Sequence, residues 1–263
     1  MILVDDHCHL MHKAYSDLDK VIENAKKAGV KAIICSGVNP PTNREALEIA
    51  KKYPMVRASL GIYPVDALGI GQDVAEGLSS HEGAIDLDKE FEFIKKHKDN
   101  IAAVGEVGLD YHWVKDAELQ KKERENFARI IEFVERLGKP MIVHTRKAEQ
   151  DCVDMLTSSK LKNVILHCFE GRKSLIKKAA DAGYIFSVPT SIAKSQHFQV
   201  LVEMVNINQI TTETDGPYLS PDGSFPNNPE NVKVVIDKIA QIKKFEAEEV
   251  ANNVWMNFQR IYG

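Results

Sequence analysis

Short apolar runs rich in β-branched residues alternate along the chain with stretches of helical periodicity. This alternation is typical of βα units around a parallel sheet, whose strands are covered on both faces. The predicted strands are Ile2–Asp5, Ala32–Cys35, Val56–Leu60, Ile101–Gly105, Met141–His144, Val164–His167, Tyr184–Ser187 and Gln209–Glu213. The 263 residues are close to the roughly 250 of a (β/α)8 barrel. We therefore expect an α/β protein with a single TIM-barrel domain over residues 1–263.

Two helices are clearest in the pattern. Their apolar stripes are Leu18, Val21, Ile22, Ala25 and Ala28, and then Phe127, Ile130, Ile131, Val134 and Leu137. Ser16 and Asp19 have the spacing of a capping box, and Gly29 and Gly138 are placed to end the two helices. Residues 64–88 are expected to form an irregular loop with some helix, at the mouth of the barrel. The rival doubly wound sheet has no G-x-G-x-x-G after the first strand to support it.

Composition excludes several classes of function. With 38 acidic and 34 basic side chains, the net charge of −4 leaves no general positive field for duplex nucleic acid. No apolar run reaches the roughly 18 residues of a membrane span, and the first residues read as a strand rather than a signal peptide. We expect a cytoplasmic protein without membrane contact, whose four cysteines (Cys8, Cys35, Cys152, Cys168) are reduced and mostly buried.

Polar residues able to bind metal collect at the carboxyl ends of five predicted strands. They are His7, His9, Glu106, His144, His167 and Asp215. The carboxyl ends of barrel strands converge on one mouth, so these side chains are expected to meet there. Left empty, four imidazoles and two carboxylates would form a costly buried cluster, which a divalent ion stabilises. Mixed nitrogen and oxygen ligands favour zinc, manganese, iron or nickel over magnesium.

Strand alternation separates ligand candidates from their neighbours. Cys8 and Cys168 should face away from the adjacent histidines, and Glu213 should share the face of Asp215 and orient a ligand. The remaining histidines (His12, His81, His97 and His197) are expected to be solvated. His112 follows the fourth predicted strand. The sequence leaves open whether it has a structural role or lies at the mouth of the barrel.

Five strings around these residues resemble the TatD family of metal-dependent deoxyribonucleases, within the amidohydrolase-like barrels. They are Asp6-His7-Cys8-His9-Leu10, Gly105-Glu106-Val107-Gly108-Leu109-Asp110-Tyr111, Val143-His144-Thr145-Arg146, Leu166-His167-Cys168-Phe169-Glu170-Gly171 and Glu213-Thr214-Asp215-Gly216-Pro217-Tyr218-Leu219. The resemblance implies two divalent ions. One is held by His7, His9 and Asp215, the other by His144 and His167, with Glu106 between them.

The chain departs from the family pattern at two places. Where the family commonly has G-I-H-P-H, this chain has Gly61-Ile62-Tyr63-Pro64-Val65, and where it commonly has R-N-x-P, this chain has Asn227-Asn228-Pro229. The resemblance implies that these positions lie near a substrate phosphate. Deoxyribonuclease activity is therefore expected to be weak or restricted to particular substrates.

Metal-dependent hydrolysis is the expected chemistry, with Asp215 as general base and Glu106 as the second catalytic residue. Tyr63, Tyr111 and Arg146 are candidate substrate contacts. The favoured substrate is a phosphodiester, such as the 3′ end of single-stranded DNA. The alternatives are a small amide, lactone or phosphoester, or a non-catalytic binding protein that its metal stabilises.

Overall fold

The computed structural model describes residues 1–70 and 76–263. Eight parallel strands form one sheet in the order of the chain. They are β1 (Leu3–Cys8), β2 (Val30–Ser36), β3 (Val56–Ile62), β4 (Ile101–Asp110), β5 (Met141–Arg146), β6 (Val164–His167), β7 (Ile185–Pro189) and β8 (Ile210–Glu213). The amide of Asp215 donates to the carbonyl of His7, and the amide of His9 donates to Gly216. These bonds join the chain after β8 to β1, so the predicted (β/α)8 barrel is confirmed.

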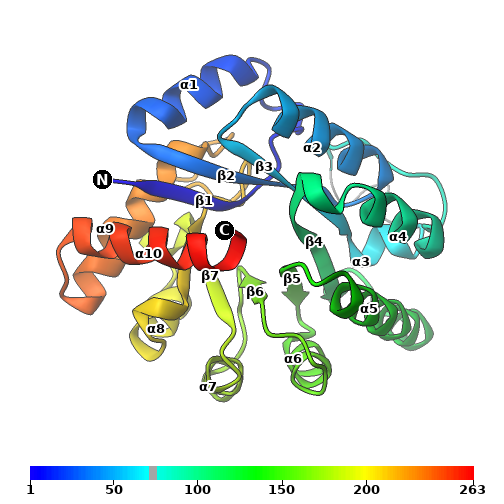
Figure 1. The fold of residues 1–263 in the computed structure, drawn as a ribbon. Helices are drawn as coiled ribbons and strands as arrows, with labels where there is room; N and C mark the ends of the chain where they lie inside the picture. Colours follow the sequence, from blue (N-terminus) through cyan, green and yellow to red (C-terminus); the bar gives the residue numbers. More distant parts are fainter. Residues whose placement is uncertain (71–75) are drawn as a thin grey trace.

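Helices surround the strands, as Figure 1 shows. They are α1 (Leu18–Ala28), α2 (Pro40–Lys52), α3 (Pro64–Ala67), α4 (Leu87–Lys96), α5 (Ala117–Leu137), α6 (Glu149–Thr157), α7 (Lys173–Asp181), α8 (Gln196–Met204), α9 (Val232–Lys243) and α10 (Ala247–Tyr262). Short 3₁₀ turns occupy Lys98–Asn100, Thr190–Ala193, Ile207–Gln209 and Pro229–Asn231. In the described part of the chain, no helix is long and apolar enough to cross a membrane.

Several strands extend further toward the mouth than the sequence predicted. β1 continues to Cys8 and β4 to Asp110, because the ladder between Gly108–Asp110 and His144–Arg146 continues past the apolar run. The expected ligands His7 and Glu106 therefore lie on strands rather than after them. Their backbone is fixed by neighbouring strands on both sides, which suits a site that needs precise geometry.

The ends of the two clearest helices differ in one respect from expectation. Gly29 and Gly138 do end α1 and α5, with φ of 97° and 72° in the left-handed region. The predicted capping box of Ser16 is wrong, because α1 is capped by Asp17, whose side chain accepts from the amide of Lys20 at 3.0 Å. The Asp17 carboxylate, one position after Ser16, thus accepts from a backbone amide in the first turn that has no partner within the helix.

The amino-terminal end of the barrel is closed by α10. Asn257 on this helix donates to the carbonyls of Ile207 and Ile210, both at 2.8 Å, beside the start of β8. Arg57, at the start of β3, donates to the carbonyl of Tyr262. Because this end is covered, the opposite end is the one left open to a ligand.

The segment 64–88 fits the expected mixture of helix and irregular chain. It begins with the single turn of α3 and ends as α4 starts at Leu87. Asp66 and Leu78 line the cavity at the mouth, as expected for a loop after β3. Residues 71–75 of this segment lie outside the described part.

Candidate metal centre

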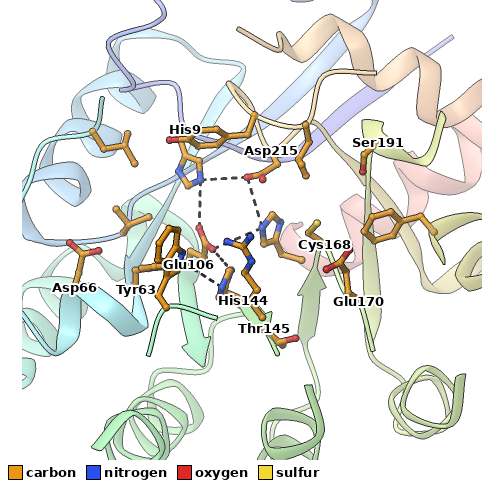
Figure 2. A pocket seen from close by; sticks show the side chains of 18 of the residues that line it. His9, Tyr63, Asp66, Glu106, His144, Thr145, Cys168, Glu170, Ser191 and Asp215 are labelled. Carbon is orange, nitrogen blue, oxygen red and sulfur yellow. Dashed lines mark hydrogen bonds and ion pairs between the residues drawn. The ribbon is translucent and has the colours of Figure 1, made fainter. Parts of the chain in front are cut away.

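The structure brings the six predicted ligands together at the carboxyl ends of the strands. They are His7, His9, Glu106, His144, His167 and Asp215. Figure 2 shows His9, Glu106, His144 and Asp215 around one cavity. Three overlapping groups of these residues could each hold an ion, with ligand atoms that all lie within 4.8 Å of one another. Most of these side chains are buried, with His7 completely inaccessible to solvent.

Glu106 occupies the middle of the cluster and faces two pairs of imidazoles. Its Oε2 lies 3.3 Å from Nε2 of His7 and 3.5 Å from Nε2 of His9. Its Oε1 lies 2.8 Å from Nδ1 of His144 and 4.0 Å from Nε2 of His167. A single carboxylate thus directs one oxygen to each half of the site, which is the arrangement a bridging ligand needs.

Asp215 closes the cluster on the side of β8. Its Oδ1 lies 3.6 to 3.9 Å from the Nε2 atoms of His7, His9 and His167. The rings of His7 and His167 are stacked, with centroids 3.8 Å apart. Asp215 is the more exposed of the two central carboxylates, with 16% of its side chain accessible against 5% for Glu106. Asp215 therefore presents more of its carboxylate to water in the cavity than Glu106 does.

The pKa values in this cluster show how its charges balance without an ion. Burial lowers the pKa of His7 to about 4, which keeps its ring neutral. Burial also opposes protonation of His144 and His167, but nearby carboxylates prevail and raise their pKa values to about 9 and about 10. His144 and His7 hold the pKa of Glu106 well below its usual range, against the effect of burial. A divalent cation would supply positive charge to the same carboxylates, so the donor set fits a metal.

A second layer of carboxylates holds the histidine rings. Oε2 of Glu213 lies 2.9 Å from Nδ1 of His167, and its Oε1 accepts from the amide of Cys168. Oδ2 of Asp110 lies 3.0 Å from Nε2 of His144 and also accepts from the Tyr63 hydroxyl at 2.7 Å. Glu213, for which an orienting role was predicted, thus lies beside the His167 ring.

Asp110 is the residue that the sequence reading missed. It stands four positions after Glu106 on β4, so alternation in an extended strand places both on one face. That signal was present in the sequence, but the predicted strand ended too early for it to be applied. The hydroxyl of Tyr63, predicted to contact substrate, is already bonded to Asp110, although the side chain does line the cavity.

A cavity of about 530 Å³ opens above the cluster. Its wall includes apolar side chains (Val38, Leu78, Trp113, Phe198, Leu219) and the carboxylates of Asp66 and Glu170. Among the described residues that line it, Arg146 is the one lysine or arginine. The cavity therefore offers one permanent cation beside the histidine and carboxylate cluster.

Two residues lie elsewhere than the sequence suggested. Cys168 lines the cavity instead of facing away, because its φ of 43° in the left-handed region breaks the strand alternation after His167. His12 is buried rather than solvated, and its Nε2 lies 2.8 Å from the carbonyl of Glu76. All four cysteines are free thiols, as expected, and burial raises the pKa of Cys168.

The other positions discussed from the sequence lie apart from the cavity. His81, His97, His112 and His197 are partly buried rather than fully solvated, and none of the four is among the residues that line the cavity in the described chain. The Tyr111 hydroxyl lies between Arg124, at 2.8 Å, and Asp151, at 2.7 Å.

Of the three positions where family histidine and arginine residues are replaced, Val65 and Asn227 are buried away from the cavity, whereas Tyr63 lines it. Val65 is 1% exposed and Asn227 is fully buried. The Asn227 amide donates to Oγ1 of Thr190 and to the carbonyls of Thr214 and Tyr218. Neither side chain faces the cavity, so neither is placed to contact a substrate phosphate there.

Comparison with known proteins agrees with this geometry. The family model described as TatD related DNase matches residues 4–263. The chain is 37% identical to an uncharacterized metal-dependent hydrolase of Methanocaldococcus jannaschii, over 97% of this chain and 94% of the relative. It is 33% identical to the human deoxyribonuclease TATDN3, over 99% of this chain and 94% of that protein.

Solved structures show the same fold. A TatD homologue from Escherichia coli K12 superposes with a TM-score of 0.83 at 21% identity, over 99% of this chain and 97% of that one. A TatD family hydrolase from Entamoeba histolytica gives the same TM-score at 19% identity, over 100% of this chain and 98% of that one. The chain belongs to the TatD family of metal-dependent hydrolases.

Proposed function

We propose that this hydrolase cleaves phosphodiester bonds with two divalent ions, and that short single-stranded DNA ends are its substrate. The observation that carries the proposal is the position of Glu106, whose two oxygens face separate imidazole pairs. A site for one structural ion has no need of a carboxylate shared between two ligand groups. The deoxyribonuclease name of the human relative supports the same substrate class.

In this proposal His7, His9 and Asp215 would hold one ion, His144 and His167 would hold the other, and Glu106 would serve both. The mixture of imidazole and carboxylate favours zinc, manganese, iron or nickel over magnesium. When bound, the ions would supply Lewis-acid activation of water and of the phosphate. Free, mostly buried thiols are compatible with the predicted cytoplasmic location.

Asp215 acts on the proton of the attacking water. Despite burial, the neighbouring histidines keep the pKa of Asp215 below its ordinary value, so the carboxylate is ionised and can accept a proton. The water oxygen bonds to phosphorus as the bond from phosphorus to the leaving oxygen breaks, and the proton passes to Asp215. Glu106 keeps the two halves of the site at a fixed separation.

A second candidate, hydrolysis of a smaller ester or amide, is favoured by the cavity wall. One arginine, two peripheral carboxylates and several apolar side chains suit a ligand with little charge. The two functions are distinguished by the substrate that the protein hydrolyses, a phosphodiester in the first case and a smaller ester or amide in the second. The metal-stabilised binding protein is the less favoured reading because the cavity leaves Asp215 accessible to water.

The test is a substrate screen on protein stripped with chelator and reloaded with manganese, zinc, nickel, iron or magnesium. Phosphodiesters, phosphomonoesters, amides and lactones are compared at the same metal content. We expect metal-dependent turnover on phosphodiesters, single-stranded DNA among them, and none on protein without metal. Turnover of amides or lactones with no phosphodiester cleavage would overturn the proposal in favour of the second candidate.

A further inference from the structure

The outer wall of the cavity combines a flat aromatic side chain with a cation. Trp113, in the turn after β4, lines the cavity yet is 45% exposed. The guanidinium carbon of Arg146, the last residue of β5, lies 5.9 Å from the centre of the Trp113 ring. Within residues 1–70 and 76–263, the Arg146 side chain makes no hydrogen bond or ion pair with another side chain. The pair is therefore free to bind a ligand.

The other tryptophan of the chain, Trp255, has a structural role and serves as a comparison for Trp113. Trp255 on α10 is half-buried and stacks on Phe258, with ring centroids 5.9 Å apart. Trp113, by contrast, has one aromatic neighbour among the described residues, the ring of His112, which it meets edge-on with centroids 5.0 Å apart. A large apolar ring at the mouth, outside the core and beside an arginine, is typical of a binding surface.

We infer that Trp113 is a stacking platform for a nucleobase and that Arg146 binds a phosphate oxygen of the same strand; this deepens the proposed phosphodiesterase function and rests on it. Stacking of a base on an aromatic side chain strengthens binding by about 5- to 150-fold per base. The guanidinium matches phosphate through paired hydrogen bonds.

The rest of the cavity limits the length of strand that enters. About 530 Å³ lies in the range of pockets for small ligands, so a few unpaired nucleotides fit where a duplex does not. Asp66 and Glu170 on the wall repel a continuous run of phosphates. Recognition therefore depends on the base at Trp113 as well as on backbone charge.

The experiment compares a single-stranded DNA trinucleotide with the same backbone lacking its bases. Manganese-loaded protein is expected to cleave the intact trinucleotide with kcat/KM about 5- to 150-fold higher than the abasic strand. The Trp113→Leu variant should bring this ratio close to one. Phe225→Leu is the matched control, because Phe225 is 61% exposed in the loop after β8 but does not line the cavity.

A binding measurement separates this inference from the proposed function. In the Trp255→Phe background, the remaining tryptophan fluorescence reports Trp113 alone, and the intact trinucleotide should quench it more than the abasic strand. Arg146→Gln should weaken binding of both strands by the same factor and reduce the dependence on salt.

Equal kcat/KM for the two strands, or a ratio that Trp113→Leu leaves unchanged, would overturn the platform while leaving phosphodiester cleavage intact. Base-dependent quenching without cleavage of either strand would support the platform and refute the proposed activity. Absence of both cleavage and base-dependent quenching would refute both.

Discussion

Oδ2 of Asp110 lies 3.0 Å from Nε2 of His144, on the side of the ring turned away from Glu106. The imidazole is thus held between two carboxylates, with Nδ1 directed at the centre of the cluster. A carboxylate in this position fixes the ring and makes the other nitrogen a better ligand. Tyr63, in place of a family histidine, holds the same Asp110 oxygen through its hydroxyl.

Asp110→Asn should weaken the binding of one metal ion by about 10- to 100-fold, the usual effect of losing such a partner. Tyr63→Phe removes only one neutral donor, so about 2- to 12-fold is expected. Competition with a chelating dye, measured separately for the two ions, checks both values. Wild-type affinity in Asp110→Asn would show that the carboxylate does not orient His144.

The shared position of Glu106 predicts unequal losses of metal. Glu106→Ala should lose both ions or hold one weakly, because each half of the site loses an oxygen. His144→Ala should mainly affect the ion on its own side, leaving about one per chain. Metal content by mass spectrometry after gel filtration distinguishes the two results. Similar, small losses from both variants would exclude a bridging carboxylate.

Asp215→Asn keeps the shape of the side chain but removes its charge and basicity. Turnover should fall by about 10²- to 10⁴-fold, the range for a lost general base, with a smaller change in KM. Metal content is measured in the same sample, since Asp215 also faces three imidazoles. A fully loaded variant with wild-type turnover would remove Asp215 from the proton transfer.

Local patterns predicted the barrel and the six clustered residues for physical reasons. Buried parallel strands must be apolar on both faces, so they are visible as continuous runs, and a barrel brings their polar ends to one mouth. The ends of the strands were predicted less well. β4 continues through Val107–Asp110 because it pairs with β5, and pairing between strands far apart in sequence is invisible in a short window.

The burial of individual loop residues could not be predicted from the sequence for a related reason. His12 is buried because Glu76 and the ring of Tyr218 lie against it, and both come from loops distant in the sequence. Asn227 likewise bonds to three residues in the two segments that follow β7 and β8. A polar residue in a loop carries no sequence signal that separates a solvated side chain from one that organises its neighbours.

The family pattern suggests that an arginine at position 227 would contact a substrate phosphate, but the buried hydrogen bonds of Asn227 predict a different result. Asn227→Arg should not add a phosphate contact; it should destabilise the fold by roughly 2–4 kcal/mol, because it breaks several buried hydrogen bonds and inserts a charge. Urea denaturation measures this loss. Asn228→Arg is the control, since Asn228 is partly exposed and makes one long bond, at 3.4 Å. Unchanged stability with increased nuclease turnover would contradict the prediction.

Glu123 on α5 gives the protein a measurable dependence of stability on pH. The side chain is buried, its Oε2 accepts from the amide of Asp110 at 3.4 Å, and burial raises its pKa to about 8. The folded state therefore keeps a proton that the unfolded chain loses near its ordinary pKa of 4.5. The stabilising contribution of this proton is complete below that value and is lost as the pH rises through about 8.

Glu123→Gln, which cannot ionise, should remove this part of the pH dependence. The Tm of the variant minus the Tm of wild type should be larger by several degrees at pH 8.5 than at pH 5. This is the shift that a change of about 1 to 2 kcal/mol in the free energy of unfolding produces. Thermal melts followed by circular dichroism at the two pH values make the measurement. Glu125→Gln on the exposed side of α5 is the matched control and should follow wild type at both. Parallel pH profiles for Glu123→Gln and wild type would show that Glu123 is ionised in the folded protein at neutral pH.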